Sequence, residues 1–289
     1  AYHDVWLQDE EGNRQNVTEF EPVEEPVYGT RYLPRKFKTG IALPQDNCVD
    51  ILNYDLGLLG IVEDGRLVGY NVFVGGGQGV TPSAKKTYVA IARKMAFVVP
   101  SRAVALARAI VCVFRDHGNR CDRKTARLKY LLRDWGLERF RETVEEYLGE
   151  SLAEPHAAEV TDVEDHLGWH SQGDGREFLG IYVENGRIQD TEESRTKLAL
   201  RQVLEAFELP TRMTAMQNIL LCDIEPSQKT EIDAMLADSG VLPAESRSLL
   251  RRFSMACPAL PTCGLSITES ERVMPSLLDA LEGELQRQG

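Results

Sequence analysis

The chain has 289 residues, of which 45 are acidic and 33 are basic, so its formal net charge at pH 7 is −12. This charge argues against a general binder of nucleic acids or anionic membranes, because neutralising phosphates requires a cationic surface. No apolar run approaches the length of a membrane span, and six cysteines are too few for a secreted disulfide framework. We therefore expect a protein of a reducing compartment, the cytoplasm, with no nucleic-acid or membrane partner.

The first part of the chain predicts a sheet. Residues 1–30 are acidic and contain several prolines, which is typical of an extended lead-in. Residues 37–43 have the composition of a strand. Two apolar runs, residues 58–62 and 67–74, flank Asp64-Gly65, and this arrangement predicts a β-hairpin.

Three helices are expected next, and each is followed by a glycine. Ser101 is the expected N-cap of the first helix, which reaches about residue 116 before Gly118. Asp122 is the expected cap of the second, which carries a leucine stripe and ends at Gly136. The third ends at Gly149. Residues 31–149 thus predict one α/β module.

The second half of the chain predicts a smaller unit. Residues 150–175 are polar and predict a linker, and residues 176–245 predict a ferredoxin-like half-module. Residues 246–289 would hold a cysteine loop, a helix with Ile267, Val273 and Met274, and a last helix that starts at Pro275. The half-module should contain a strand at 178–183, a helix at 194–207, strands at 212–216 and 219–224, and a helix at 227–238. The predicted fold class is α+β.

Two cysteines, Cys257 and Cys263, lie on one Pro-containing loop with five residues between them. A 4Fe-4S cluster takes four thiolates, so this pair can supply two corners of such a cluster. Two other interpretations stay open from the spacing: inert buried thiols, or a disulfide. Cys112 lies in an apolar run that is typical of a helix core.

Three cations, Arg35, Lys36 and Lys38, occupy four positions at the start of the strand expected at 37–43. Strand alternation puts Lys36 and Lys38 on one face and Arg35 and Phe37 on the other. Two ammonium groups on one face repel each other unless water or an anion lies between them. The pattern therefore indicates either a solvated edge strand or an anion site.

Three consecutive glycines, Gly75, Gly76 and Gly77, follow the second hairpin strand. They match neither the dinucleotide-binding fingerprint nor a P-loop. The glycines indicate either a flexible turn or backbone that lies against a flat ligand, with Lys85 and Lys86 close behind.

A basic cluster surrounds the start of the expected second helix and contains Asn119, Arg120, Arg123 and Arg127. On that helix Arg123 and Arg127 would be one turn apart. Cations are disfavoured at a helix N-terminus, and a polyanionic ligand would offset this cost. Arginine is well suited to paired carboxylates, although a solvated helix face is also consistent with these charges.

At this point the sequence resembles a known family, the sulfite and nitrite reductases that contain sirohaem and a 4Fe-4S cluster. Separate segments resemble those of the family in the same order, and together they run over nearly the whole chain. The cysteine segment is most similar to the sulfite branch, in which Met-Ala-Cys and Pro-Thr-Cys frame the pair. The segments are Leu33–Lys38, Val74–Gly77, Lys85–Tyr88, Arg115–Lys124 and Ser254–Cys263.

The resemblance implies a sirohaem-binding α/β module, a ferredoxin-like half-module and the start of a second sirohaem and cluster module. It also implies six-electron reduction of sulfite to sulfide, with electrons from a ferredoxin or a flavoprotein reductase. Lys36 and Lys38 would contact the substrate and supply protons, and Cys257 and Cys263 would be cluster ligands. The residues implied to surround the sirohaem are Arg35, Gly75, Gly76, Gly77, Asn119, Arg120, Arg123, Arg127, Gln217 and Asn218.

Two departures from the family pattern predict a fragment that cannot reduce the substrate alone. An N-terminal module of the family and its second cysteine pair have no counterpart in the chain. Other functions stay open: a nitrite reductase of the same family, a non-catalytic iron–sulfur or structural protein, or a zinc site. A zinc site would use Cys257 and Cys263 with His166 and His170.

Overall fold

The structure is a computed structural model that describes residues 5–17, 25–81 and 83–288. The chain forms two compact units, Ala1–Asp162 and Val163–Gly289, and each is described by itself. In the part of the chain that the structure describes, no helix is both long and apolar enough to cross a membrane.

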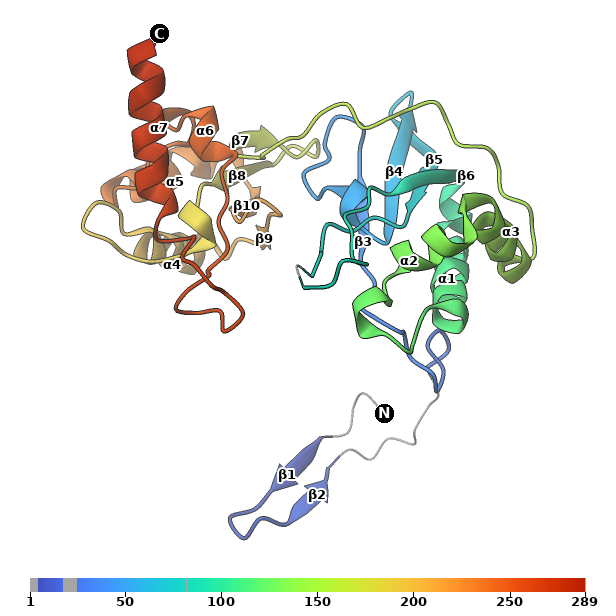
Figure 1. The fold of residues 1–289 in the computed structure, drawn as a ribbon. Helices are drawn as coiled ribbons and strands as arrows, with labels where there is room; N and C mark the ends of the chain where they lie inside the picture. Colours follow the sequence, from blue (N-terminus) through green and yellow to red (C-terminus); the bar gives the residue numbers. More distant parts are fainter. Residues whose placement is uncertain (1–4, 18–24, 82, 289) are drawn as a thin grey trace. The chain divides into compact units, whose positions relative to one another are not determined.

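The first unit contains a four-stranded sheet in the order β3-β4-β5-β6 (Figure 1). Strand β3 runs parallel to β4, and the other neighbours are antiparallel. The expected hairpin is confirmed: Asp64 and Gly65 connect β4 and β5, and both have positive φ angles, 48° and 72°. The strands are β3 (Thr39–Ala42), β4 (Leu56–Glu63), β5 (Arg66–Val74) and β6 (Arg93–Val98).

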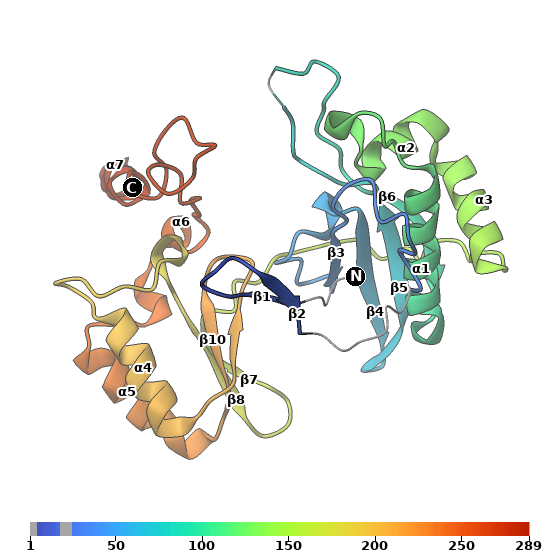
Figure 2. The same ribbon diagram turned by 90° about the horizontal axis from the view of Figure 1, so that it is seen from below.

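Three helices cover one face of this sheet, as Figure 2 shows from below: α1 (Pro100–His117), α2 (Leu128–Trp135) and α3 (Leu137–Leu148). Side chains from the sheet and all three helices form one core, in which Phe114 and Phe140 are fully buried. A second, smaller cluster around Ile51 and Phe73 also packs strand side chains. Strand β4 is therefore almost continuously buried, in agreement with its unbroken apolar run.

The helix ends differ from the expectation at two positions. Helix α1 begins one residue earlier than Ser101, because Pro100 takes the first helical position and Val99 is the N-cap. Asp122 caps only a short 3-10 helix, η2 (Arg123–Thr125), by accepting a hydrogen bond from the Lys124 N–H. Arg127 then has an extended backbone, so Arg123 and Arg127 do not share a helix. The terminations at Gly118, Gly136 and Gly149 are confirmed.

The second unit contains a four-stranded antiparallel sheet in the order β7-β8-β10-β9. Helices α4 (Thr196–Phe207) and α5 (Lys229–Asp238) pack on it side by side (Figure 2). The strands are β7 (Gly168–Ser171), β8 (Glu177–Ile181), β9 (Thr211–Met213) and β10 (Ile219–Ile224). The strand–helix–strand–strand–helix order is as predicted, but β7 was not predicted, because it is short and only partly buried.

The polar stretch expected as a linker, residues 150–175, is divided between the two units. Its first part lies along the sheet of the first unit: Phe97 N–H donates to Ala153, and the buried Asn71 side chain donates to His156 and Ala158. The later part supplies β7 of the second unit.

The two ends of the described chain also differ from the expectation. The lead-in contains a small antiparallel hairpin, β1 (Trp6–Gln8) and β2 (Arg14–Asn16), and residues 18–24 lie outside the described part. The helix expected around Ile267 and Val273 is wrong, because the Ile267 side chain is 92% exposed and finds no core to pack on. Helix α7 (Met274–Gln288) forms with Pro275 in its first turn, as predicted, and a short helix α6 (Leu249–Arg252) precedes the cysteine loop.

Candidate functional site

A buried carboxylate connects three segments of the first unit that the sequence singled out. Asp55 has an exposed fraction of 0%. Arg127 binds it with two hydrogen bonds, Nε to Oδ1 at 3.0 Å and Nη2 to Oδ2 at 2.8 Å. The backbone N–H of Lys38 donates to Oδ2 at 2.9 Å. Our reading of the sequence missed Asp55, although an aspartate directly before the apolar run at Leu56 was a visible signal.

The glycine turn is held against the same residues. Gly75 N–H donates to the Asp55 carbonyl at 3.0 Å, and Gly76 N–H donates to the Tyr54 carbonyl at 2.8 Å. A Cβ at Gly76 would lie 2.2 Å from the Leu52 carbonyl oxygen, so close backbone packing excludes any larger residue there. At Gly77 a Cβ would lie 3.3 Å from Nη2 of Arg127. The turn is therefore packed, which argues against the first of the two interpretations, a flexible turn.

Arg35, Lys36 and Lys38 lie in irregular backbone just before β3 rather than in a strand. Phe37 packs into the core, with its ring 5.8 Å from that of Phe114, while Lys36 and Lys38 are exposed. The Lys38 ammonium lies 5.8 Å from the centre of the Tyr54 ring. Packing of Phe37 separates the two exposed lysines from the core, but the predicted strand alternation is wrong, because the backbone here is irregular and Arg35 and Lys36 line the same cavity while Lys38 does not.

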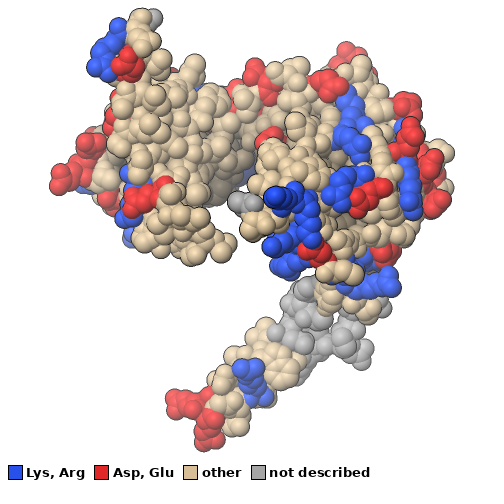
Figure 3. Space-filling view, in the orientation of Figure 1, with Lys and Arg blue, Asp and Glu red and all other residues tan. Residues whose placement is uncertain are grey.

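A cavity of about 400 Å³ opens beside these residues. No carboxylate lies among its described lining residues, and Lys38 and Gly75–Gly77 are not among them. Figure 3 shows Lys and Arg side chains gathered on this face of the first unit. The six cations that line the cavity are Arg35, Lys36, Arg123, Lys124, Arg127 and Lys129. Such a lining favours a ligand with several negative charges.

The six cations differ in how far the protein itself engages them. Among the described residues, the side chains of Arg35, Lys36, Arg123 and Lys124 make no hydrogen bond or ion pair. Lys129 is buried, and its ammonium donates to the carbonyls of Gly77 and Gly79, each at 3.0 Å, and to that of Tyr88. Burial lowers the pKa of Lys129, and the neighbouring Arg127 lowers it further. Lys129 therefore fixes the loop after the glycines, and four other cations of the lining stay available for a ligand.

Two predicted sirohaem contacts have structural roles. Arg120 donates from Nη1 to the Arg31 carbonyl at 3.0 Å, and from Nη2 to those of Tyr32 and Arg115 at 2.6 and 2.8 Å. The Asn119 side chain accepts from the Cys121 N–H at 2.9 Å and donates to Thr125 at 3.0 Å. Neither residue lines the cavity. Arg120 fastens the segment that leads to Arg35 onto the end of α1, and Asn119 holds the turn that precedes η2.

The cysteine loop lies in the second unit between α6 and α7. Cys257 is exposed, Cys263 is half-buried, and both thiols are free. The side-chain amide of Gln217 donates to the Ala256 carbonyl at 3.0 Å, directly before Cys257. Gln217 and Asn218 thus belong to the unit that holds the cysteines, and Gln217 fastens their loop.

Both amides keep buried polar atoms without a partner among the described residues: Oε1 of Gln217 and Nδ2 of Asn218. The other end of the Asn218 side chain accepts from the Val183 N–H at 2.9 Å. Unsatisfied buried polar atoms are costly, so this place is suited to a further polar partner.

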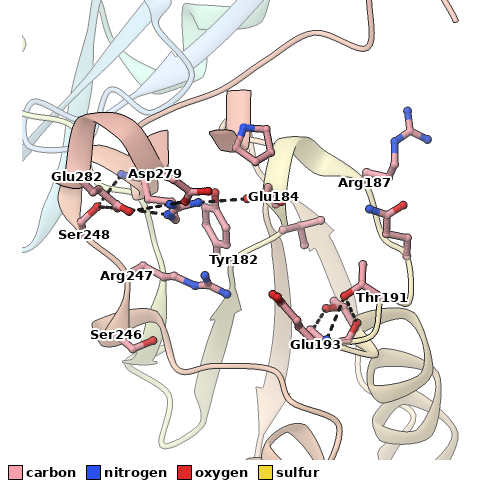
Figure 4. Close-up of a pocket in the computed structure, with 16 residues that line it drawn as sticks. Tyr182, Glu184, Arg187, Thr191, Glu193, Ser246, Arg247, Ser248, Asp279 and Glu282 are labelled. Carbon is pink, nitrogen blue, oxygen red and sulfur yellow. Dashed lines mark hydrogen bonds and ion pairs between the residues drawn. The ribbon is translucent and has the colours of Figure 1, made fainter. Parts of the chain in front are cut away.

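A second cavity, of about 470 Å³, lies in the same unit but has a different electrostatic character (Figure 4). Arg251 is buried on its wall and pairs with Glu184 at 3.4 Å, Asp279 at 2.6 Å and Glu282 at 2.7 Å. This pairing raises the pKa of Arg251 and lowers the pKa of Glu282. The carboxylates already balance the cations here, so this cavity does not offer the anion site of the first unit.

Comparison with known proteins agrees with this geometry. Residues 1–152 match the family model described as the nitrite and sulphite reductase 4Fe-4S domain. Residues 170–239 match the nitrite/sulfite reductase ferredoxin-like half domain, which confirms the predicted half-module.

Curated relatives align over the whole chain. A sulfite reductase (ferredoxin) of Synechococcus elongatus is 40% identical over 302 residues, covering 100% of this chain and 48% of the relative. A sulfite reductase (NADPH) hemoprotein beta-component of Geobacillus thermodenitrificans is also 40% identical, covering 100% of this chain and 50% of the relative. The chain therefore spans about half the length of the curated relatives that it matches.

The fold agrees with a solved structure. The structure of the Mycobacterium tuberculosis NirA protein superposes with a TM-score of 0.73 at 30% identity, covering 88% of this chain and 45% of that one. From the family models, the relatives and the fold together, the chain belongs to the nitrite and sulphite reductase 4Fe-4S family.

Proposed function

We propose that this chain is part of a sulfite reductase, which reduces sulfite to sulfide with six electrons and uses sirohaem and a 4Fe-4S cluster. The observation that carries the proposal is the basic cavity of the first unit, with six cations and no carboxylate in its described lining. The two curated relatives above are both named sulfite reductases, which favours sulfite. Nitrite is the competing substrate, because the family model includes both kinds of reductase.

The residues of both units fit the two cofactors. In the first unit, Arg35 and Arg123 make no ion pair within the described chain and line the cavity, so both are available for the carboxylates of a macrocycle. In the second unit, Cys257 and Cys263 are free thiols, the ligand type that iron–sulfur clusters take. When bound, the two cofactors would carry electrons from an external donor to the substrate.

The chain's own contribution is to bind and protonate the anion. The ammonium groups of Lys36 and Lys38 are exposed and can donate hydrogen bonds to sulfite oxygens. Each holds protons at Nζ that can pass to an oxygen as it leaves as water. Positive charge at this place stabilises the negative charge that develops on the substrate as electrons arrive.

The experiment replaces Lys36 or Lys38 by Met in the full-length protein that contains this chain. Sulfite and nitrite turnover are measured with reduced methyl viologen as the electron donor. Losing one such contact should lower sulfite turnover about 100-fold, or about 3 kcal/mol of transition-state stabilisation, while the haem absorption bands persist.

Lys197→Met is the matched control, because Lys197 is an exposed lysine on α4 of the second unit. It should retain wild-type turnover. Full activity in both Lys36 and Lys38 variants would remove these lysines from the mechanism. Wild-type protein with no haem bands, or with turnover of nitrite alone, would contradict the proposed function.

We also propose a cytoplasmic location and a soluble electron donor. The two relatives are named for ferredoxin and for NADPH, so either a ferredoxin or a flavoprotein reductase fits. Turnover with each purified donor in place of methyl viologen distinguishes them.

A further inference from the structure

Asp55 joins three parts of the proposed anion site, Lys38, Arg127 and the glycine turn, that lie far apart in the sequence. Its carboxylate accepts two hydrogen bonds from Arg127, 72 residues later, and one from the backbone of Lys38, 17 residues earlier. Its own backbone carbonyl accepts from Gly75. The fully buried carboxylate thus accepts three hydrogen bonds, at least one on each oxygen, from one arginine and one backbone N–H.

These bonds fix the backbone of Lys38 from both sides. Its N–H binds the Asp55 side chain at 2.9 Å, and its carbonyl accepts from the Leu56 N–H at 3.1 Å. The parallel pairing of β3 with β4 begins at the next residue, Thr39, opposite Leu56. Asp55 therefore holds the N–H of Lys38, the one backbone hydrogen-bonding group of this residue that β4 does not engage.

The same carboxylate orients Arg127. Nε and Nη2 of Arg127 are directed to Asp55, and Nη2 also lies 3.4 Å from the Gly76 carbonyl. Nη1 has no partner among the described residues, and Arg127 lines the cavity. The bidentate pair thus leaves the edge of the guanidinium at Nη1 free to donate to a ligand in a defined direction.

We infer that Asp55 is the positioning residue of the anion site: it sets the backbone of Lys38 and the guanidinium of Arg127 without touching the ligand. Asp55 is fully buried and is not among the residues that line the cavity. This inference rests on the proposed function for the ligand, sulfite, but the tie between Asp55 and Lys38 can be measured without turnover.

The experiment uses the full-length protein with Asp55→Ala, which removes all three hydrogen bonds, and Asp55→Asn. The asparagine keeps the shape but has one acceptor oxygen, so its amide group must face a nitrogen of Arg127 or Lys38. If Asp55→Ala fails to fold, Asp55→Asn carries the test. Asn71→Ala is the matched control in the same unit, because Asn71 is fully buried and makes three hydrogen bonds, all to residues 156 and 158.

Two quantities are compared: hydrogen exchange of the Lys38 amide, and the split of sulfite turnover into KM and kcat. In Asp55→Ala we expect the Lys38 amide to exchange at least tenfold faster and the sulfite KM to rise about tenfold. In Asp55→Asn we expect a smaller rise in KM. Asn71→Ala should lower the melting temperature and leave both quantities unchanged.

The outcomes separate this inference from the proposed function. A wild-type KM in folded Asp55→Ala or Asp55→Asn, with active wild-type protein, overturns the positioning role. Unchanged Lys38 exchange in Asp55→Ala overturns the tie itself. Wild-type protein without sulfite turnover contradicts the proposed function, and Lys38 exchange then still decides whether Asp55 organises the site.

Discussion

The buried ion pair between Asp165 and Arg252 in the second unit gives a sharp prediction about stability. Nε and Nη2 of Arg252 donate to the two carboxylate oxygens at 2.7 and 2.8 Å, and the Leu167 N–H adds a third hydrogen bond at 3.0 Å. The two side chains are unequally exposed, 1% for Asp165 and 22% for Arg252. Removing Arg252 should therefore lower the free energy of unfolding by a different amount than removing the charge of Asp165.

Arg252→Met should be the more damaging change. It leaves a buried carboxylate without its counter-charge, which costs about 3–5 kcal/mol of the free energy of unfolding. Asp165→Asn leaves a guanidinium that can turn towards water and should cost about 2 kcal/mol. The double variant should cost less than the sum, because the charge that each single change leaves unpaired is then absent.

The pair also predicts how stability depends on pH. Burial raises the pKa of Asp165, but the Arg252 guanidinium and the Leu167 N–H outweigh it and hold this pKa below its ordinary value of 3.8. A lowered pKa in the folded state stabilises the protein above the unfolded value, and this contribution is lost as the pH falls through the folded pKa. Asp165→Asn should therefore show a weaker loss of stability below about pH 4 than the wild type.

The assay is urea unfolding followed by tryptophan fluorescence at pH 7 and at pH 3. Arg201→Met is the control, because Arg201 and Glu205 form an exposed pair, 70% and 72% accessible, whose loss should cost under about 0.5 kcal/mol. The reasoning is refuted if Arg252→Met costs no more than Arg201→Met, or if Asp165→Asn costs more than Arg252→Met.

Two further predictions concern the cysteine loop. Gln217→Ala removes the hydrogen bond to the Ala256 carbonyl, so iodoacetamide should alkylate the half-buried Cys263 several-fold faster than in the wild type. Gln202→Ala on α4 is the control and should leave the alkylation rate unchanged. Equal rates in the wild type and both variants would contradict the role of Gln217 in fastening the loop. The 289-residue chain alone, reconstituted with iron and sulfide under argon, should hold well below four iron atoms, because only two free thiols share the loop. Four irons per chain, abolished by Cys257→Ser, would show that another cysteine or a second chain completes the site.

Features that depend on near neighbours in the chain could be predicted from the sequence. The Asp64-Gly65 hairpin, the glycine terminations of α1, α2 and α3, and the helix at Pro275 follow from backbone preferences of a few adjacent residues. The segments that resemble the family also contain the charged and thiol side chains themselves, so most cations of the basic cavity and the pair of cysteines could be identified from the sequence.

The contacts that each of these residues makes depend on how distant segments pack in the folded protein. Arg120 and Arg127 have the same chemistry in the sequence, yet Arg120 binds backbone carbonyls while Arg127 pairs with Asp55 and faces the cavity. Asp55 was overlooked because its partners are 17 and 72 residues away, and no local pattern encodes such a pairing. Burial of this single carboxylate required both partners at once, and that condition arises only when the sheet and α2 pack together.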